Sequence, residues 1–163
     1  MKHKLLAFVT TGAIAGAALG GSLAVAADGT MPVASKFALE GKIIQGDGVG
    51  KNGETFALIY EETGTGSANG PDHKMHCLGV IQGGAGSIVE QHGYCIETDP
   101  DGDQVMWKVT PAAHLMTAPT TLAVHEAFAG TGKYSGIALK LNSTYQLSDS
   151  SPAGYKLKCE FTP

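Results

Sequence analysis

The fold is decided by residues 74–109, whose sequence is KMHCLGVIQ, GGAGS, IVEQHGYCIET, DPDGD, QVMWKV. The stretch holds three apolar runs, and two clusters of turn-forming residues separate them. The Gly-Gly-Ala-Gly sequence at 83–86 and the Asp-Pro-Asp-Gly sequence at 99–102 favour tight bends between strands. We therefore expect a three-stranded antiparallel meander, which contains two of the three cysteines and the only tryptophan of the chain.

Further strands are expected on both sides of this meander. Apolar residues alternate with polar ones at period two, as in Phe37 and Leu39 or in Phe56, Leu58 and Tyr60. The expected strands cover residues 36–45, 55–62, 121–129, 134–147 and 155–161. Residues 64–73 are expected to form a polar loop, and residues 111–119 a connection with room for one helical turn between its prolines.

These elements amount to roughly seven to nine short strands with no convincing amphipathic helix, a pattern typical of a β-barrel or a β-sandwich. We expect an all-β fold, and within it a closed antiparallel β-barrel of about eight strands with a calycin-like build. A closed barrel pairs the first strand with the last and so leaves no exposed sheet edge.

The N-terminal residues have the pattern of a secretory signal peptide. A basic head with Lys2 and Lys4 precedes an apolar run that is rich in alanine and glycine, and Ala24-Val25-Ala26 ends it with small residues. The alternative is a retained membrane anchor, but polar residues and glycines weaken the run. We expect residues 1–26 to be the signal peptide, 27–35 a polar lead-in and 36–163 the barrel domain. The mature protein would then be periplasmic or secreted, with no stable membrane span.

Charge argues against nucleic acid as a partner. The formal net charge is −4, and all 11 basic residues are lysines. A chain without arginine lacks the planar guanidinium groups that bind phosphate in two places at once. We expect no nucleic-acid partner and no cofactor.

The segment EAFAGTGKYSG at residues 126–136 resembles the G-T-G-x-[YF]-x-G segment of small secreted barrels of the allene oxide cyclase and dirigent group. The resemblance implies an eight-stranded antiparallel barrel of calycin type, here from a bacterial branch. Plant members of the group guide cyclisation or coupling of reactive small molecules in an apolar cavity. The absence of arginine departs from the dirigent proteins, and the motif's glycines Gly130, Gly132 and Gly136 serve the turn and the bend of the strand and do no chemistry.

The three cysteines of an exported chain suggest one disulfide and one remaining thiol. Cys77 and Cys95 lie on the two arms of the first hairpin and are the favoured pair. Five positions separate Cys77 from Gln82 and eight separate Ser87 from Cys95, so direct pairing needs a bulge or a longer loop. Pairing of Cys159 with either of the other two stays open.

A metal site is a weaker hypothesis for the same hairpin. Imidazole, thioether and thiolate groups suit zinc or copper, and His73, His76 and His92 are the candidate ligands beside Met75 and the two cysteines. Period two directs His76 to the face opposite that of Met75 and Cys77, so the groups cannot all converge. We expect no metal site.

Catalytic candidates are Glu90 and His92, which would share one strand face with Ile88 and Tyr94. If that face lines the barrel, the two are buried polar residues suited to acid–base chemistry; if it faces water, they carry no function. His125, Glu126 and Tyr134 are further possible members of such a pair. Candidate ligand-binding residues are Tyr94, Trp107 and Tyr134.

Three functions remain in view. The first is binding of a small apolar ligand in the barrel mouth. The second is a cyclase- or isomerase-like enzyme that acts on a reactive apolar small molecule. The third is a structural or assembly protein of the cell envelope, in which exposed strand faces pair subunits into a homo-oligomer.

Overall fold

The computed structural model describes residues 33–50, 54–67, 72–151 and 153–162. The predicted signal peptide lies outside the described residues. Nine strands and one short 3-10 helix make up the described chain: β1 (Lys36–Val49), β2 (Thr55–Ser67), β3 (His73–Gly84), β4 (Ser87–Thr98), β5 (Gln104–Pro111), β6 (His114–Leu115), β7 (Thr120–Gly130), η1 (Gly132–Tyr134), β8 (Leu139–Ser151) and β9 (Gly154–Thr162).

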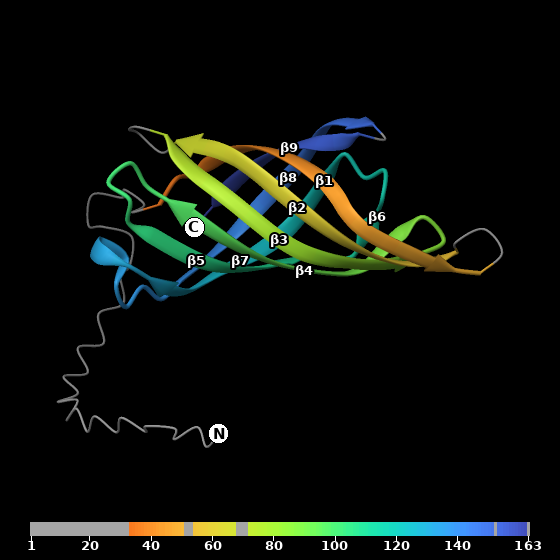
Figure 1. Ribbon diagram of the computed structural model, residues 1–163, viewed down its shortest axis with the longest axis horizontal. Coiled ribbons are helices and arrows are strands. Elements are labelled where there is room, and N and C mark those ends of the chain that lie inside the picture. Colours follow the sequence, from red (N-terminus) through yellow and green to blue (C-terminus); the bar gives the residue numbers. More distant parts are fainter. Residues whose placement is uncertain (1–32, 51–53, 68–71, 152, 163) are drawn as a thin grey trace, which may run out of the picture.

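Eight long strands close into an antiparallel barrel (Figure 1). Each long strand pairs with its neighbours in the order β1, β2, β3, β4, β5, β7, β8, β9, and β9 pairs back onto β1. The two-residue strand β6 adds to β4 where β5 has already ended. The all-β fold and the closed barrel of eight strands are thus confirmed, and closure gives every long strand two partners.

Two connections differ from the sequence-based expectation. Residues 111–119 form no helix but contain one hydrogen-bonded turn, in which the N–H of Ala118 donates to the carbonyl of Leu115; bonds from Ala112 to Leu122 and from Met116 to Gly86 hold the rest of the segment against the barrel. Residues 64–67 continue β2 and are not part of a loop. Gly64 and Gly66 permit this, since a side chain at either position would meet the backbone of β1.

The barrel interior is divided into two apolar clusters. The larger one contains Trp107, Leu39, Leu141 and Phe161, and the smaller one contains Tyr60, Ile81 and Ile88 with Phe56 and Leu58 beside them. Val33 and Ala34 join the larger cluster and are fully buried. The end of the expected polar lead-in is therefore core, because its two apolar residues cap one end of the barrel.

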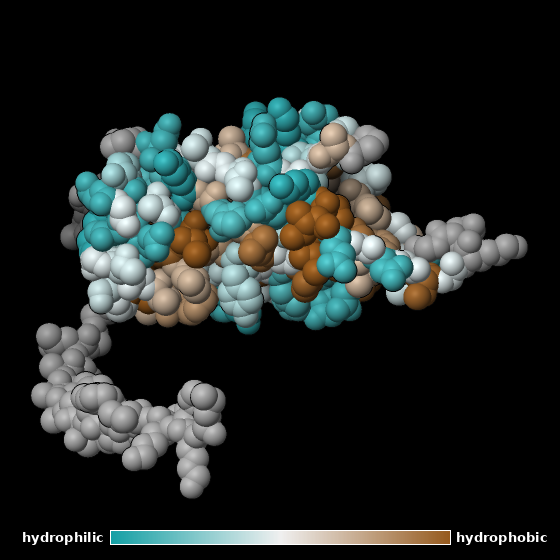
Figure 2. Space-filling view, viewed as in Figure 1, coloured by the Kyte–Doolittle hydropathy of each residue, from teal (hydrophilic) through white to brown (hydrophobic). Residues whose placement is uncertain are grey.

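Hydrophobic residues also interrupt the polar outer surface (Figure 2). Ile59 pairs with Val80 and Leu78 pairs with Tyr94 across neighbouring strands, and the Tyr94 ring meets Phe128 edge-on with centroids 6.0 Å apart. We call these five residues the outer apolar row. Within the described part of the chain, no helix has the length and hydropathy needed to cross a membrane.

Candidate ligand cavity and its buried carboxyl

A cavity of about 320 Å³ occupies the end of the barrel opposite Val33 and Ala34. Its rim includes residues of the 111–121 connection and of the turn between β8 and β9, among them Met116 and Ser151. Aliphatic and aromatic side chains form most of the wall. Glu62 and three tyrosines, Tyr60, Tyr145 and Tyr155, supply polar groups inside it.

Glu62 and Tyr155 meet across a glycine. Gly41 on β1 pairs with Glu62 on one side and with Tyr155 on the other. A Cβ atom at Gly41 would collide with the Tyr155 ring, so the missing side chain makes room for that ring to lie over β1. The Tyr155 hydroxyl then donates a hydrogen bond of 2.9 Å to Oε1 of Glu62.

Glycines also make room for the Tyr60 ring. Tyr60 lies two residues before Glu62, so strand alternation turns both side chains into the barrel. Tyr60 pairs with Gly79, which pairs in turn with Gly93, and a Cβ atom at either glycine would lie 2.5 Å from a Tyr60 side-chain atom. The ring therefore covers two glycines, and its hydroxyl group lies over Gly93.

The Glu62 carboxyl is almost completely removed from solvent, with 4% of the residue exposed. Burial raises its pKa to about 7, and the hydrogen bond from Tyr155 offsets part of that rise. Burial and the Glu62 charge together raise the pKa of Tyr60 and of Tyr155 above the usual value, so both hydroxyls stay protonated. Glu62 is thus a carboxyl that exchanges its proton near neutral pH inside an apolar chamber.

Tyr145 connects the cavity to a second buried group. Its hydroxyl lies 3.0 Å from Nε2 of His125, and the two rings stack with centroids 5.8 Å apart. Burial lowers the pKa of His125 to about 3, so the imidazole is neutral at physiological pH. The Nδ1 atom of His125 is buried without a hydrogen-bond partner in the described structure. Cys159 lies beside Tyr145, and burial raises the pKa of its thiol to about 12.

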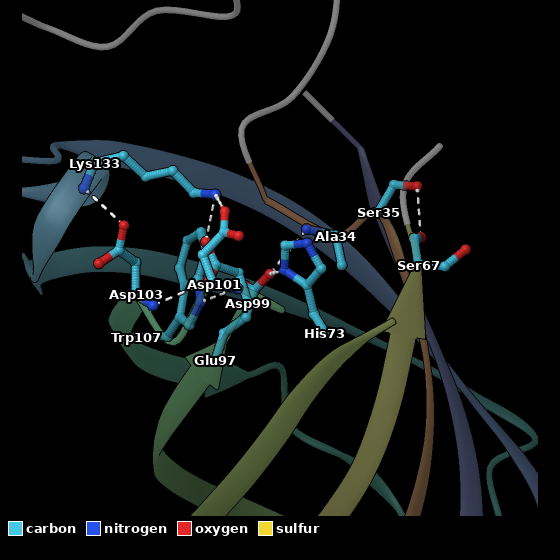
Figure 3. A network of polar contacts seen from close by, with 10 residues as sticks. All are labelled: Ala34, Ser35, Ser67, His73, Glu97, Asp99, Asp101, Asp103, Trp107 and Lys133. Carbon is cyan, nitrogen blue, oxygen red and sulfur yellow. Dashed lines mark hydrogen bonds and ion pairs between the residues drawn. The ribbon is translucent and has the colours of Figure 1, made fainter. Parts of the chain in front are cut away.

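The other end of the barrel is closed by a polar network around Glu97 (Figure 3). Oε1 of Glu97 accepts the backbone N–H of Ala34 at 2.8 Å and lies 2.7 Å from Nδ1 of His73. Oε2 accepts the indole N–H of Trp107 at 3.0 Å. The hydrogen bond to Glu97 raises the pKa of His73 above its usual value. Glu97 therefore joins Ala34, at the start of the described chain, to Trp107 inside the closed end of the barrel.

The turn after β4 completes this closed end. Oδ1 of Asp99 accepts the backbone N–H groups of Asp101 and Asp103 at 2.8 and 3.0 Å, and Gly102 takes a positive φ of 92°. Lys133 in η1 pairs with Oδ2 of Asp99 at 2.6 Å. The predicted Asp-Pro-Asp-Gly turn is thus stabilised by hydrogen bonds within the turn, and its ion pair with Lys133 holds η1 against the barrel.

The catalytic candidates lie outside the cavity. Glu90 and His92 are on the outer face of β4, where their side chains bond to each other at 2.7 Å. Ile88 points into the barrel, whereas Tyr94 points outward, so the four residues do not share one face. The reason is a β-bulge: Gln82 pairs with Glu90 and Gly83 pairs with Ile88, so the residue between them on β4 is extra. As a result Ile88 and Glu90 point to opposite faces of the sheet, although they are two positions apart.

The ligand-binding candidates do not line the cavity either. Tyr94 lies on the outer face with 57% of its surface exposed. Trp107 and Tyr134 are buried in the larger apolar cluster at the closed end. His125, a further candidate for acid–base chemistry, is inside the barrel, and its contact with Tyr145 connects it to the cavity wall.

The three candidate metal ligands are far from forming one site. His73 bonds to Glu97, His76 bonds to Glu61 at 3.0 Å on the outer surface, and His92 bonds to Glu90. Among the described residues, no group of three or more His, Cys, Asp or Glu side chains is placed to hold a metal ion.

Cys77 and Cys95 form a disulfide between directly opposite residues of β3 and β4. Strand β3 continues through Gly84, so seven positions separate Cys77 from the turn and eight separate the turn from Cys95. The extra residue near Val89 absorbs the remaining difference. The predicted pairing is confirmed, Cys95 lines the cavity, and Cys159 is a buried free thiol.

Sequence reasoning missed Glu62 and Tyr155. One signal was available, because the alternation of Phe56, Leu58 and Tyr60 continues to Glu62, which places a carboxyl on the apolar face of β2. The contact with Tyr155 had no such signal, since it depends on barrel closure between β1 and β9.

No protein-family model matches this chain, and neither does any curated protein or solved structure that was compared with it. The resemblance to the allene oxide cyclase and dirigent group therefore stays a prediction.

Proposed function

We propose that this protein is an exported β-barrel that binds a small, mostly apolar molecule in its cavity. The observation that carries the proposal is the interior space of about 320 Å³, which is walled by side chains such as Phe56, Leu58 and Ile81. Ligand pockets are typically hollows of this kind, with apolar walls and a few polar groups that orient the ligand. This cavity is at the small end of their size range, so it suits a compact ligand.

Export is supported by two independent features. Residues 1–26 have the charge and hydropathy pattern of a cleaved signal peptide. The Cys77–Cys95 disulfide is of the kind that forms and persists in oxidising compartments such as the periplasm or the extracellular space.

Binding is tested with N-phenyl-1-naphthylamine, a neutral apolar dye whose emission rises in apolar surroundings. Titration of the mature protein should give saturable emission with one site per chain. Leu58→Trp fills part of the cavity and should weaken the dye's affinity at least tenfold. Val80→Trp introduces the same side chain on the outer face and should leave the affinity unchanged. Absence of saturable binding, or an equal effect of both variants, would overturn the proposal.

A second candidate is an isomerase- or cyclase-like enzyme, and the observation that favours it is Glu62. A carboxyl whose pKa is about 7 both accepts and returns protons at working pH, which general acid–base catalysis requires. The group that handles the proton would then be Glu62 with Tyr155, in place of Glu90 or His92.

Proton abstraction by Glu62 is tested with 5-nitrobenzisoxazole, a small apolar substrate that opens when a base removes its ring proton. The wild-type protein should open it faster than Glu62→Gln, with a rate that rises through about pH 7. Glu90→Gln serves as the matched control on the outer face and should keep the wild-type rate. Equal rates for wild type and Glu62→Gln would remove this candidate.

The outer apolar row supports a third candidate, assembly of the chain into a homo-oligomer. Five large hydrophobic residues gather across strands β2, β3, β4 and β7 on the outer face. Sedimentation of the mature protein decides this candidate. An oligomer that Leu78→Lys dissociates would support it, and a monomer at all concentrations would refute it.

A further inference from the structure

We propose that the ligand of the cavity carries a protonated amine, which pairs with the Glu62 carboxylate while an apolar body fills the rest of the space. This inference rests on the proposed binding function and names its ligand class. It follows from the charge of the cavity, from the unused bonding capacity of Glu62 and from the rings around that carboxyl.

Among the described residues, the side chains that line the cavity include one carboxyl and no lysine. That carboxyl is Glu62, and none of the ion pairs of the described residues includes it. The lysines nearest in register lie outside, where Lys42 pairs with Glu61. Burial of a carboxylate without a cation costs free energy. A ligand that brings a cation to Glu62 would form the ion pair that the protein lacks, and this pairing would favour its binding.

Glu62 also keeps a free acceptor. Oε1 accepts the Tyr155 hydroxyl, whereas Oε2 takes no hydrogen bond from the described residues. An ionised carboxylate has about four lone-pair sites, so a single neutral donor leaves most of its capacity unused. An ammonium group has three donors and matches this surplus better than a hydroxyl group does.

Aromatic rings line the cavity around the same point. Tyr60, Tyr145 and Tyr155 all contribute to its wall. The faces of such rings attract cations, most strongly where water is excluded. A carboxylate ligand would instead meet the Glu62 charge, and no lysine of the described cavity wall would neutralise it, which disfavours anionic molecules such as free fatty acids.

Three naphthalene probes of similar size test the inference: 2-naphthylmethylamine, 2-naphthylmethanol and 2-naphthoic acid. Calorimetric titration at pH 8 should rank their affinities in the order amine, alcohol, acid, with the amine at least tenfold tighter than the alcohol. Glu62→Gln should bring the amine and the alcohol within about twofold of each other. Glu61→Gln removes a carboxyl from the outer face of the same strand and should leave the ranking unchanged.

Amine affinity should also rise with pH. Between pH 6 and pH 8 Glu62 ionises while the amine remains protonated, so the amine should bind several-fold more tightly at pH 8 and the alcohol should not. The other titratable groups that face Glu62 are Tyr60, Tyr145, Tyr155 and Cys159, and burial raises the pKa of each of them, which keeps them protonated. Gly41 on β1 and the disulfide-bonded Cys77 on β3 do not titrate.

His125 lies behind Tyr145 and stays neutral over this range. Of the described histidines, His114 is the one that lines the cavity, and His114→Gln should keep the pH response of the amine.

The outcomes separate this inference from the function on which it rests. If none of the three probes binds, the binding function itself fails. If the alcohol binds as tightly as the amine, or the acid binds most tightly, the cavity is a binding site and the amine inference is wrong. If Glu62→Gln keeps the preference for the amine, the cation is recognised elsewhere and the assignment to Glu62 is wrong.

Discussion

The Tyr155 hydroxyl and Oε1 of Glu62 are joined by a hydrogen bond of 2.9 Å although 93 positions of sequence separate the two residues. They meet because Gly41 stands between them in the same row of paired residues. The bond lies inside the barrel, and Glu62 is the one carboxyl among the described residues that line the cavity. Barrel closure between the first and last strands therefore builds the polar part of the site.

Gly41→Ala should break this arrangement. The new Cβ atom would collide with the Tyr155 ring, and the ring would have to leave its place over β1. Overpacking of this kind costs about 1–3 kcal/mol in the free energy of unfolding. Urea unfolding should show the loss, and the N-phenyl-1-naphthylamine titration should show weaker binding. Tyr155→Phe keeps the ring and removes the hydroxyl, so a smaller loss of stability is expected for it; equal stability of Gly41→Ala and wild type would contradict the role of the glycine.

Glu62→Gln should change how stability depends on pH. The folded-state pKa of Glu62, about 7, lies above its ordinary value of 4.5, so the folded protein binds more protons between these pH values than the unfolded chain does. The Glu62 contribution to stability is therefore present below pH 4.5 and is lost as pH rises through 7. The variant lacks this loss, and its free energy of unfolding relative to wild type should rise by roughly 2–4 kcal/mol from pH 4.5 to pH 8.

The comparison with wild type is needed because the contribution of His125 to stability changes with pH in the direction opposite to that of Glu62. Its folded-state pKa, about 3, lies below the ordinary 6.5, so its contribution is lost as pH falls. Both proteins contain His125, and its effect cancels in the difference. A difference that stays constant from pH 4.5 to pH 8 would show that Glu62 is not a buried carboxyl with a raised pKa.

Glu97→Gln should open the closed end of the barrel. Both carboxylate oxygens of Glu97 now accept hydrogen bonds, from Ala34, His73 and Trp107. A glutamine side chain has one acceptor oxygen, so its NH₂ group would lie against one of these donors and that hydrogen bond would be lost. We expect a loss of about 2–4 kcal/mol in the free energy of unfolding. Trp107 is the only tryptophan, so its fluorescence reports directly on this end of the barrel.

The matched control for Glu97→Gln is Glu126→Gln, which removes an exposed carboxylate paired with Lys140 at 2.7 Å. Exposed pairs contribute little to stability, so this variant should unfold at the wild-type urea concentration. Equal midpoints for both variants would show that the buried network does not stabilise the fold.

Removal of the disulfide by Cys77→Ala with Cys95→Ala should lower the free energy of unfolding by about 3 kcal/mol, because the bond closes a loop of 18 positions in the unfolded chain. Urea unfolding without reductant measures the loss. A thiol assay on the denatured, unreduced wild type should count one reactive group, which is Cys159. Three reactive groups in the exported protein would contradict the pairing.

Glu90→Gln and His92→Gln should leave binding in the cavity unchanged within about twofold. Both side chains lie on the outer face of β4 and bond to each other there, so neither can touch a ligand inside the barrel. Calorimetry with 2-naphthylmethylamine measures the affinity. A loss comparable to that of Glu62→Gln would place the ligand on the outer surface.

Local pattern was sufficient for several features of this protein. Alternation at period two, glycine-rich turns and the absence of helical periodicity indicated an all-β chain, and the burial of sheet edges favoured a closed barrel. The placement of Cys77 and Cys95 on the two arms of one hairpin favoured their bond, although the unequal arms required an extra residue for direct pairing. The all-β class depends on neighbours in the sequence and was determined by the sequence alone, whereas the closed barrel and the Cys77–Cys95 bond were the favoured alternatives.

Only the tertiary structure decided which side chains form the cavity. One extra residue near Val89 turned Glu90 and His92 outward, and a shift of one position reverses every later side chain of a strand. Glu62 met Tyr155 through the pairing of β1 with β9, which joins the two ends of the domain. Such contacts depend on register across the whole barrel, and local alternation does not encode the register of distant strands.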